Sequence, residues 1–435
     1  MERNAFNQLV AWKKNPQHQP LIIQGARQVG KTWLMQEFGR KEYKNTVYIN
    51  FEDQKDIAPI FEQDYDVNRI LDWFSLRYNQ TILPHDTLII FDEIQACPAA
   101  ITSLKYFCEN APQYHIVAAG SLLGISLHEG ISFPVGKVEF LDLYPLNFFE
   151  FLVALGQKRY VELLQKKDMD FIRMSHPQLI TYLKQYYYVG GMPRVVQDFV
   201  DKHDYIHVRT LQEQIIRTYE NDFSKHTSKA VANRIKDLWQ SIPAQLAKEN
   251  KKFIYGLVRE GARTREYEEA LNWLEDSGLI YKVRRITRPH LPIKAYEDRS
   301  AFKLYISDIG LLGALSDLST QTVADENCVF TEFKGALTEQ YVLQQLKSNS
   351  YRSINYWTSD SGKAEIDFIL QLHNQVVPIE VKSSTNLRAK SLQFYIEQYQ
   401  PQYAVRSSQA TYKRTDNLYD IPLYMIGLLD SFLEN

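Results

Sequence analysis

The sequence predicts an α/β protein of several domains, and three observations carry this prediction. The chain has 435 residues, and a single hydrophobic core rarely extends beyond ~250–300 residues. Its first part contains short apolar runs, which predict strands buried on both faces as in a parallel sheet, with helical patterns between them. After about residue 150 the apolar spacing becomes helical. The predicted strands lie at residues 21–23, 46–51, 87–91 and 115–119.

The composition excludes several classes of protein. Hydrophobic residues make up 45% and charged residues 23% of the chain, which is typical of a globular protein rather than a disordered or fibrous one. No apolar stretch approaches the ~18 residues of a membrane helix, and the first residues do not form a signal segment. The cysteines are scattered without metal-ligand spacing, which argues against a disulfide scaffold or a zinc site. We therefore expect a cytoplasmic protein without membrane contact. The cysteines are Cys97, Cys108 and Cys328.

A glycine-rich segment follows the first predicted strand. Residues 25–32 fit the pattern G-x-x-x-x-G-K-[ST] without a mismatch, and a helix is predicted after them. The glycines let backbone N–H groups curl around phosphates, and the helix directs its positive end at them. In this pattern Lys31 reaches the β- and γ-phosphates, and the Thr32 hydroxyl is a ligand of Mg²⁺. The predicted nucleotide contacts are Gly25, Ala26, Arg27, Gln28, Val29, Gly30, Lys31 and Thr32.

Two acids end the apolar run at residues 87–91. Asp92 stands at the carboxyl end of this predicted strand, where it can hold Mg²⁺ through water, and Glu93 can orient and deprotonate an attacking water. Ser121 follows the next strand, where its hydroxyl can contact the γ-phosphate or the water. A Gly-Ser turn with a structural role is an equal alternative for Ser121. The cations considered as an arginine finger, each expected to be structural, are Arg27, Lys137 and Arg194.

Residues 241–315 combine helical patterns with an extended segment. Helical spacing at 242–259 and 265–277 precedes an apolar and basic run at 278–285. Helices followed by a β-wing are typical of a winged helix. Residues 282–299 hold six cations against two acids, and a solvated charged face is the alternative to a binding surface here. The cations are Lys282, Arg284, Arg285, Arg288, Lys294 and Arg299.

Two alternating runs near the C-terminus predict a β-hairpin. They cover residues 364–372 and 376–383, and a turn at residues 373–374 joins them. This turn places Asp367 opposite Glu380 and Glu365 opposite Lys382, with ~4.5–5.5 Å between the Cβ atoms of each pair. Two carboxylates at that spacing can share a divalent ion, and a lysine beside them can polarise a phosphate or activate water.

The arrangement D…E-x-K is the pattern of PD-(D/E)xK nucleases, and Glu339 on the preceding helix would supply a further acid. Asp367, Glu380 and Lys382 are therefore candidate catalytic residues. The motif is reduced, because Ile366 stands before Asp367 where proline is expected. The alternative is a set of ion pairs of Lys382 on an exposed sheet face, each contributing at most ~1 kcal/mol. The predicted metal ligands of the whole chain are Thr32, Asp92, Glu339, Asp367 and Glu380.

Several motifs in order along the chain resemble a known family, the prokaryotic AAA+-like ATP-binding proteins with a C-terminal domain of unknown function related to PD-(D/E)xK nucleases. The resemblance implies ATP binding and hydrolysis at residues 25–32, Asp92 and Glu93, and a winged-helix element. Arg194 stands after GGMP, where the family is expected to have an acidic residue. The pair Gly136–Lys137 stands where relatives carry Gly-Arg. The motifs are GARQVGKT (25–32), FDEIQ (91–95), AGSLL (119–123), FPVGK (133–137), YPLNFFEF (144–151), GGMP (190–193), IPAQL (242–246), LYISDIGLL (304–312) and IEVK (379–382).

Pattern and resemblance together give the expected organisation. The fold is an α/β P-loop AAA+ ATPase domain with a helical lid, a winged-helix-like middle domain and a C-terminal α/β nuclease-like domain. The expected bounds are 1–155 for the ATPase core, 156–240 for the lid, 241–315 for the middle domain and 316–435 for the nuclease-like domain.

The leading functional hypothesis is an ATPase, with ATP and Mg²⁺ as cofactors, that acts on DNA at branched or broken structures. Wing cations touching phosphates would make DNA affinity fall steeply with salt. The first alternative is an ATP-gated, Mg²⁺-dependent nuclease. The second is a nucleotide-dependent signalling or defence switch that acts on protein partners. A homo-oligomer is expected. The net charge of −2 means that any nucleic-acid surface has to be local.

Overall fold

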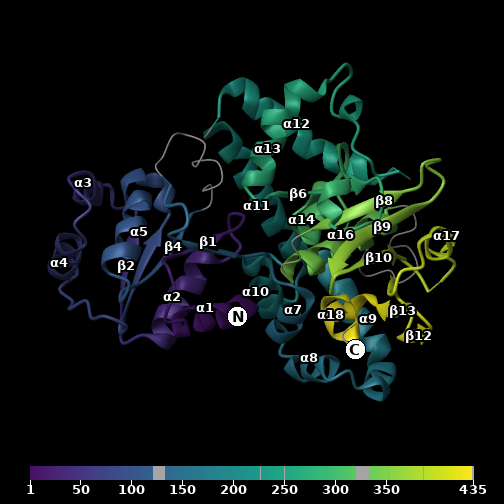
Figure 1. Ribbon diagram of the computed structural model, residues 1–435, viewed down its shortest axis with the longest axis horizontal. Coiled ribbons are helices and arrows are strands. Elements are labelled where there is room, and N and C mark those ends of the chain that lie inside the picture. Colours follow the sequence, from purple (N-terminus) through teal and green to yellow (C-terminus); the bar gives the residue numbers. More distant parts are fainter. Residues whose placement is uncertain are drawn as a thin grey trace. The chain divides into compact units, whose positions relative to one another are not determined.

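The computed structural model describes residues 1–120, 133–225, 227–248, 250–319, 333–349, 351, 353–385 and 387–433. The chain forms two compact units. The N-terminal unit contains Glu2–Tyr144 with Asp276–Gly278, and the C-terminal unit contains Pro145–Glu275 and Leu279–Asn435. Each unit has its own sheet (Figure 1).

The N-terminal unit is built on a five-stranded parallel sheet in the order β2-β3-β4-β1-β5. The strands β3 and β4 are buried along their whole length, as the apolar runs predicted, because helices cover a parallel sheet on both faces. The elements are α1 (Asn4–Lys14), β1 (Leu21–Gln24), α2 (Lys31–Glu42), β2 (Asn45–Asn50), α3 (Ala58–Glu62), α4 (Val67–Tyr78), β3 (Thr87–Asp92), α5 (Pro98–Asn110), β4 (His115–Ala119) and β5 (Glu139–Asp142).

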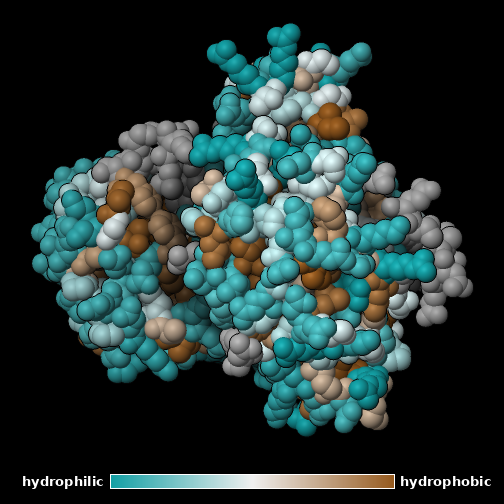
Figure 2. Space-filling view, turned by 45° about the vertical axis from the view of Figure 1, so that its right-hand side comes forward, coloured by the Kyte–Doolittle hydropathy of each residue, from teal (hydrophilic) through white to brown (hydrophobic). Residues whose placement is uncertain are grey.

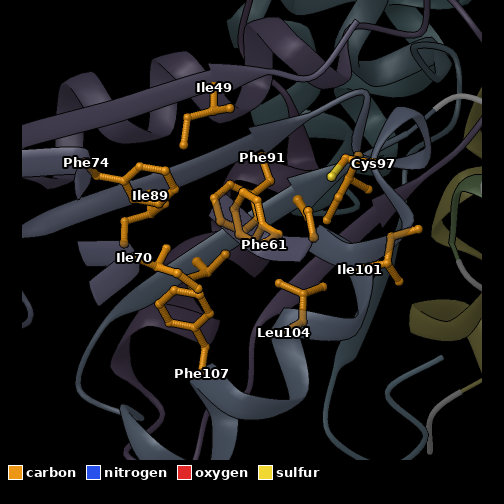
Figure 3. Close-up of a cluster of buried hydrophobic side chains, with 14 of the residues drawn as sticks. Ile49, Phe61, Ile70, Phe74, Ile89, Phe91, Cys97, Ile101, Leu104 and Phe107 are labelled. Atoms are coloured by element: carbon orange, nitrogen blue, oxygen red, sulfur yellow. The ribbon is translucent and has the colours of Figure 1, made fainter. Parts of the chain in front are cut away.

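One face of this sheet carries an aromatic core. Phe91 on β3 packs edge-on against Phe51, Phe61 and Phe74, with ring centroids 5.5 to 6.1 Å apart. Figure 3 shows side chains from strands and helices converging there around Phe61 and Phe91. Such pairs add ~0.5–1.5 kcal/mol each beyond the area they bury. This packing holds the end of β3 in place, where Asp92 stands.

The C-terminal unit combines helices with a mixed sheet of eight strands in the order β12-β13-β11-β10-β9-β8-β6-β7. Its helices are α7 (Phe148–Ala154), α8 (Lys158–Gln165), α9 (Met169–Val189), α10 (Pro193–Lys202), α11 (Tyr205–Lys225), α12 (Lys229–Leu246), α13 (Thr264–Asp276), α14 (Ile309–Leu315), α16 (Lys334–Ser348), α17 (Lys390–Tyr399) and α18 (Leu429–Leu433). Its strands are β6 (Ile280–Ile286), β7 (Glu297–Ile306), β8 (Ile354–Thr358), β9 (Glu365–Leu372), β10 (Gln375–Val381), β11 (Ala404–Ser408), β12 (Lys413–Thr415) and β13 (Leu418–Pro422).

The segment expected as a winged helix contains two helices before a hairpin, but the first does not cover the expected residues 242–259, because α12 ends at Leu246. The hairpin is also not separate from the sheet that follows. The helices α12 and α13 precede the β6–β7 hairpin, and Phe253 N donates to Phe302 O at 2.8 Å beside it. However, β6 also pairs in parallel with β8, so the hairpin ends the same sheet that contains β9 and β10. The expected boundary at residue 315 therefore does not separate two sheets. Each strand of a hairpin has one edge whose N–H and C=O groups are unpaired. On β6 these groups pair with β8.

Two motifs of the sequence meet inside the C-terminal unit. Asp308, from LYISDIGLL, accepts hydrogen bonds from Gly191 N (2.6 Å), Leu311 N (3.1 Å) and Gln344 Nε2 (3.1 Å). A Cβ atom at Gly191 would lie 2.1 Å from Leu146 O, so no side chain fits there. The GGMP and LYISDIGLL motifs are thus accounted for by packing and hydrogen bonding.

The surface is mostly hydrophilic, with hydrophobic residues in small groups on the face that Figure 2 presents. None of the described helices is both long and apolar enough to cross a membrane.

Candidate functional site

The loop between β1 and α2 has the backbone that its sequence demands. Gly25, Gln28 and Gly30 adopt positive φ angles of 144°, 65° and 94°. A Cβ atom at Gly25 would lie 2.2 Å from Leu143 O, so only glycine allows this close approach. The loop leads directly into the N-terminus of α2, where unpaired N–H groups and the helix dipole favour an anion.

Lys31 is the first residue of α2, and its side chain folds back over the loop. It is 7% exposed, and its Nζ donates to Gly25 O at 2.8 Å and Ala26 O at 2.9 Å. Burial lowers the pKa of Lys31 to about 8, although the nearby Glu93 and Asp92 oppose this shift. An ammonium group in this position needs an anion, which a phosphate would supply.

Asp92 ends β3 and lies beside Thr32. Its Oδ2 accepts from Thr32 Oγ1 at 2.7 Å and from Tyr48 OH at 2.8 Å. Burial raises the pKa of Asp92, while these two hydrogen bonds act in the opposite direction. The structure thus brings together the predicted hydroxyl and carboxylate ligands of Mg²⁺. Tyr48 was missed by the sequence analysis, because its position beside Asp92 depends on the pairing of β2 with β3.

Glu93 follows in a left-handed backbone conformation, with φ of 49°. Its N–H donates to Asp92 Oδ1 at 3.1 Å, and its Oε2 accepts from Gln95 Nε2 at 2.7 Å. The other amide atom, Gln95 Oε1, is buried and has no hydrogen-bond partner within the described ranges. Gln95 belongs to the motif FDEIQ (91–95), which does not by itself predict a role for this residue.

The remaining residues are Ser121, predicted beside the γ-phosphate, and the three cations considered as an arginine finger. Ser121 lies outside the described residues. Arg27 NH2 lies 3.9 Å from Glu52 Oε1, and Lys137 Nζ lies 3.0 Å from Glu109 Oε1. Arg194 is exposed on α10.

The site fits a nucleoside triphosphate with Mg²⁺. The loop presents backbone groups and an ammonium to phosphates, and Thr32 and Asp92 present adjacent oxygen atoms, the ligands that Mg²⁺ requires. When bound, the ion would neutralise charge on the β- and γ-phosphates.

The affinity for ATP is expected to fall as the pH rises above about 8. In the protein without ATP, Lys31 loses its proton above about pH 8, because burial lowers its pKa. Bound phosphates favour its ammonium form. Binding then requires proton uptake, which costs up to about tenfold in affinity for each pH unit. The measurement is the Kd of a fluorescent ATP analogue between pH 7 and 9.5. Lys31→Arg is the control, because arginine stays charged. The same slope in this variant would contradict the explanation.

The hairpin near the C-terminus has the predicted register. Gln375 pairs with Leu372 and Ile379 with Phe368, and both turn residues, His373 and Asn374, have positive φ angles of 46° and 62°. The regular ladder ends at Ile379. Beyond it, Asp367 Oδ2 accepts from Val381 N at 2.8 Å.

The glutamates around this hairpin, Glu339, Glu365 and Glu380, are paired with lysines. Glu339 on α16 accepts from Lys251 Nζ at 2.6 Å and from Tyr305 OH at 2.9 Å. Lys303 Nζ lies 2.6 Å from Glu365 Oε1 and 3.8 Å from Glu339 Oε2. Lys251, Lys303 and Tyr305 had not been predicted.

Lys382 pairs with Glu380 at 2.7 Å, as the ion-pair alternative foresaw, but not on an exposed face. Glu339 and Glu380 are each 5% exposed, and Lys303 is fully buried. Burial together with the nearby Glu339 and Glu380 raises the pKa of Asp367 well above its usual range.

This arrangement differs from the predicted metal site at Glu339, Asp367 and Glu380. Across the described parts of the chain, no group of three or more His, Cys, Asp or Glu side chains is placed to hold a metal ion. The physical reason is that ammonium groups already lie against oxygen atoms of Glu339, Glu365 and Glu380. These residues therefore do not fit Mg²⁺.

Three family models match separate parts of the chain. Residues 17–152 match an AAA domain, residues 180–322 a domain of unknown function (DUF8612), and residues 334–426 a further domain of unknown function (DUF4143). The first match agrees with the α/β P-loop fold of the N-terminal unit. A search of curated proteins gave no match.

Solved structures with similar folds share little sequence with this chain. The Walker-type ATPase PABY2304 of Pyrococcus abyssi is 14% identical, with a TM-score of 0.44, over 72% of this chain and 95% of that one. The ORC1 protein of Aeropyrum pernix in complex with DNA is 14% identical, with a TM-score of 0.31, over 73% and 92%. The ORC2 protein of Aeropyrum pernix in its ADP form is 13% identical, with a TM-score of 0.34, over 74% and 95%. At these TM-scores the similarities indicate no function.

Proposed function

We propose that the protein is an ATPase that binds ATP with Mg²⁺ at residues 25–32 and hydrolyses it. The observation that carries this proposal is the 2.7 Å contact between Thr32 and Asp92, with Lys31 and Glu93 beside it. In hydrolysis, Lys31 holds the β- and γ-phosphates, Thr32 and Asp92 hold the ion, and Glu93 takes a proton from the attacking water. Phosphoryl transfer depends on this positioning and on charge stabilisation more than on covalent chemistry.

Lys31→Ala tests the proposal. The variant is expected to lose ATP binding and, with it, hydrolysis, because the phosphates lose their buried cation. Binding is measured by calorimetry with ATP and Mg²⁺, and hydrolysis by phosphate release. A variant that still bound ATP and hydrolysed it like the unchanged protein would refute the proposal.

We further propose that the ATPase acts on DNA, through the six cations of residues 282–299, which lie on β6, on β7 and in the segment between them. Two of the six are neutralised, since Lys282 pairs with Glu275 and Arg285 with Asp298, at 2.7 and 2.6 Å. Three are exposed: Arg288, Lys294 and Arg299. The proposal is therefore for sequence-independent contact with phosphates, with branched or broken DNA as the substrates to compare.

The salt dependence of DNA binding is expected to be shallow. Three phosphate contacts correspond to a slope of log K against log[salt] of about −2.7 on duplex DNA, and six would give about −5.4. Fluorescence anisotropy between 50 and 200 mM salt measures this slope. Arg299→Gln should reduce it by roughly one unit, whereas Lys282→Gln should leave it unchanged. Failure to bind duplex, forked and four-way DNA at low salt would exclude a DNA role.

The structure also offers support for the second alternative, a nucleotide-dependent switch that acts on protein partners. The exposed face of α13, the helix before the hairpin, carries Glu266, Glu268 and Glu269 against Arg265. Acidic side chains repel a phosphate backbone, so α13 does not suit the major groove. ATP-dependent assembly without nucleic acid, measured by light scattering, would favour the switch. The same measurement tests the proposed homo-oligomer.

A further inference from the structure

We propose that Lys251 and Lys303, which lie within residues 180–322, neutralise a cluster of carboxylates at the C-terminal sheet that is called the carboxylate centre below. They take the place that a divalent cation would have in a nuclease. The carboxylate centre is the group formed by Glu339, Glu365, Asp367 and Glu380. The proposal does not depend on the ATPase function, because every residue concerned belongs to the C-terminal unit.

Lys251 and Lys303 lie outside the segment of the chain that contains the four carboxylates. The four carboxylates lie within residues 334–426, which one family model matches. Lys251 follows α12, and Lys303 stands on β7, so both lie within residues 180–322, which a different model matches. Lys382, which pairs with Glu380, belongs to the C-terminal segment itself.

Contacts from Lys251, Tyr305 and Lys303 occupy both oxygen atoms of Glu339 and one of Glu365. Lys251 Nζ donates a hydrogen bond to Glu339 Oε1, and Tyr305 OH donates one to Glu339 Oε2. Lys303 lies against Glu365 and within 3.8 Å of Glu339. A Mg²⁺ ion needs octahedral oxygen ligands at ~2.0–2.1 Å, and ammonium groups in the same place repel it.

Glu380 is also held by an ammonium group through one of its two oxygen atoms. Glu380 Oε1 accepts from Lys382, while Glu380 Oε2 is buried without a hydrogen-bond partner in the part of the chain that the structure describes. The ammonium group on the same carboxylate makes Glu380 a poor ligand for a divalent ion. The centre instead ties β7 and the segment after α12 to α16 and β9, and we infer that it does not cleave DNA.

Mn²⁺ alone, added to the full chain without nucleotide, tests the first half of the proposal. Free Mn²⁺ is measured by electron paramagnetic resonance, for the unchanged protein and for Glu380→Gln. Equal uptake by both proteins supports the proposal. Uptake of one more ion by the unchanged protein than by Glu380→Gln would overturn it, because the centre would then hold a metal.

A double-mutant cycle tests whether the ion pair between Lys251 and Glu339 stabilises the carboxylate centre. Lys251→Met and Glu339→Gln should each lower the midpoint of thermal unfolding of the C-terminal unit by several degrees, because each leaves a buried charge without its partner. The double variant should unfold no earlier than the less stable single variant. Lys252→Met, at the exposed neighbouring residue, should leave the midpoint unchanged. Strictly additive shifts in the double variant would overturn the proposal.

Discussion

Replacing Glu93 by glutamine is expected to slow ATP hydrolysis by about 10²–10⁴-fold and to leave ATP binding almost unchanged. The carboxylate stands next to Asp92 and is held by Gln95 at 2.7 Å, so it is placed to take a proton from water. Glutamine has nearly the same shape but cannot accept that proton. Lys31, Thr32 and Asp92, which hold the nucleotide and the ion, are untouched.

Two variants separate this role from a general disturbance of the unit. Glu62→Gln changes an exposed acid of the same unit and should hydrolyse ATP at the normal rate. Gln95→Met removes the amide that orients Glu93, so it should slow hydrolysis by less than Glu93→Gln does. Phosphate release under saturating ATP measures all three rates, and calorimetry measures binding. Normal hydrolysis by Glu93→Gln would rule out Glu93 as the base.

Local patterns were enough to predict the loop at residues 25–32 and the hairpin. The pattern of residues 25–32 specifies the loop because its glycines and its helix start are required by the backbone that binds phosphates. The register of β9 and β10 followed from a two-residue turn, and the positive φ angles of His373 and Asn374 are those of such a turn. In both cases the determining residues are neighbours in the chain.

Contacts between distant residues could not be predicted in this way. Lys251 and Glu339 are 88 residues apart, and Lys303 and Glu365 are 62 apart. No periodicity links them, so the hairpin carboxylates could be read equally as metal ligands or as members of ion pairs. The joining of β6 to β8 had the same cause, because a hairpin's own sequence does not show which strand will satisfy its free edge.

Asp308→Ala is expected to destabilise the C-terminal unit by about 3–5 kcal/mol, the range reached when a buried polar network is broken. Asp308 is fully buried and accepts from Gly191 N, Leu311 N and Gln344 Nε2. Alanine leaves Gly191 N and Leu311 N buried without an acceptor, while Gln344 Nε2 keeps the Tyr186 hydroxyl as its acceptor at 2.9 Å. The free energy of unfolding is measured in urea by tryptophan fluorescence, in a background where Trp12, Trp33 and Trp73 of the N-terminal unit are replaced by phenylalanine, so that Trp239 and the other tryptophans of the C-terminal unit report on it.

Asp168→Ala is the matched control, because Asp168 also caps a helix of this unit but is exposed. It accepts from Phe171 N at 3.0 Å at the start of α9, and water can replace it there. An exposed cap of this kind contributes about 1 kcal/mol. The difference between the two variants therefore measures what burial adds to the same hydrogen-bonding role. If both unfolded at the same urea concentration, the contact between the GGMP and LYISDIGLL motifs would not be what stabilises the unit, and those motifs would need a functional explanation instead.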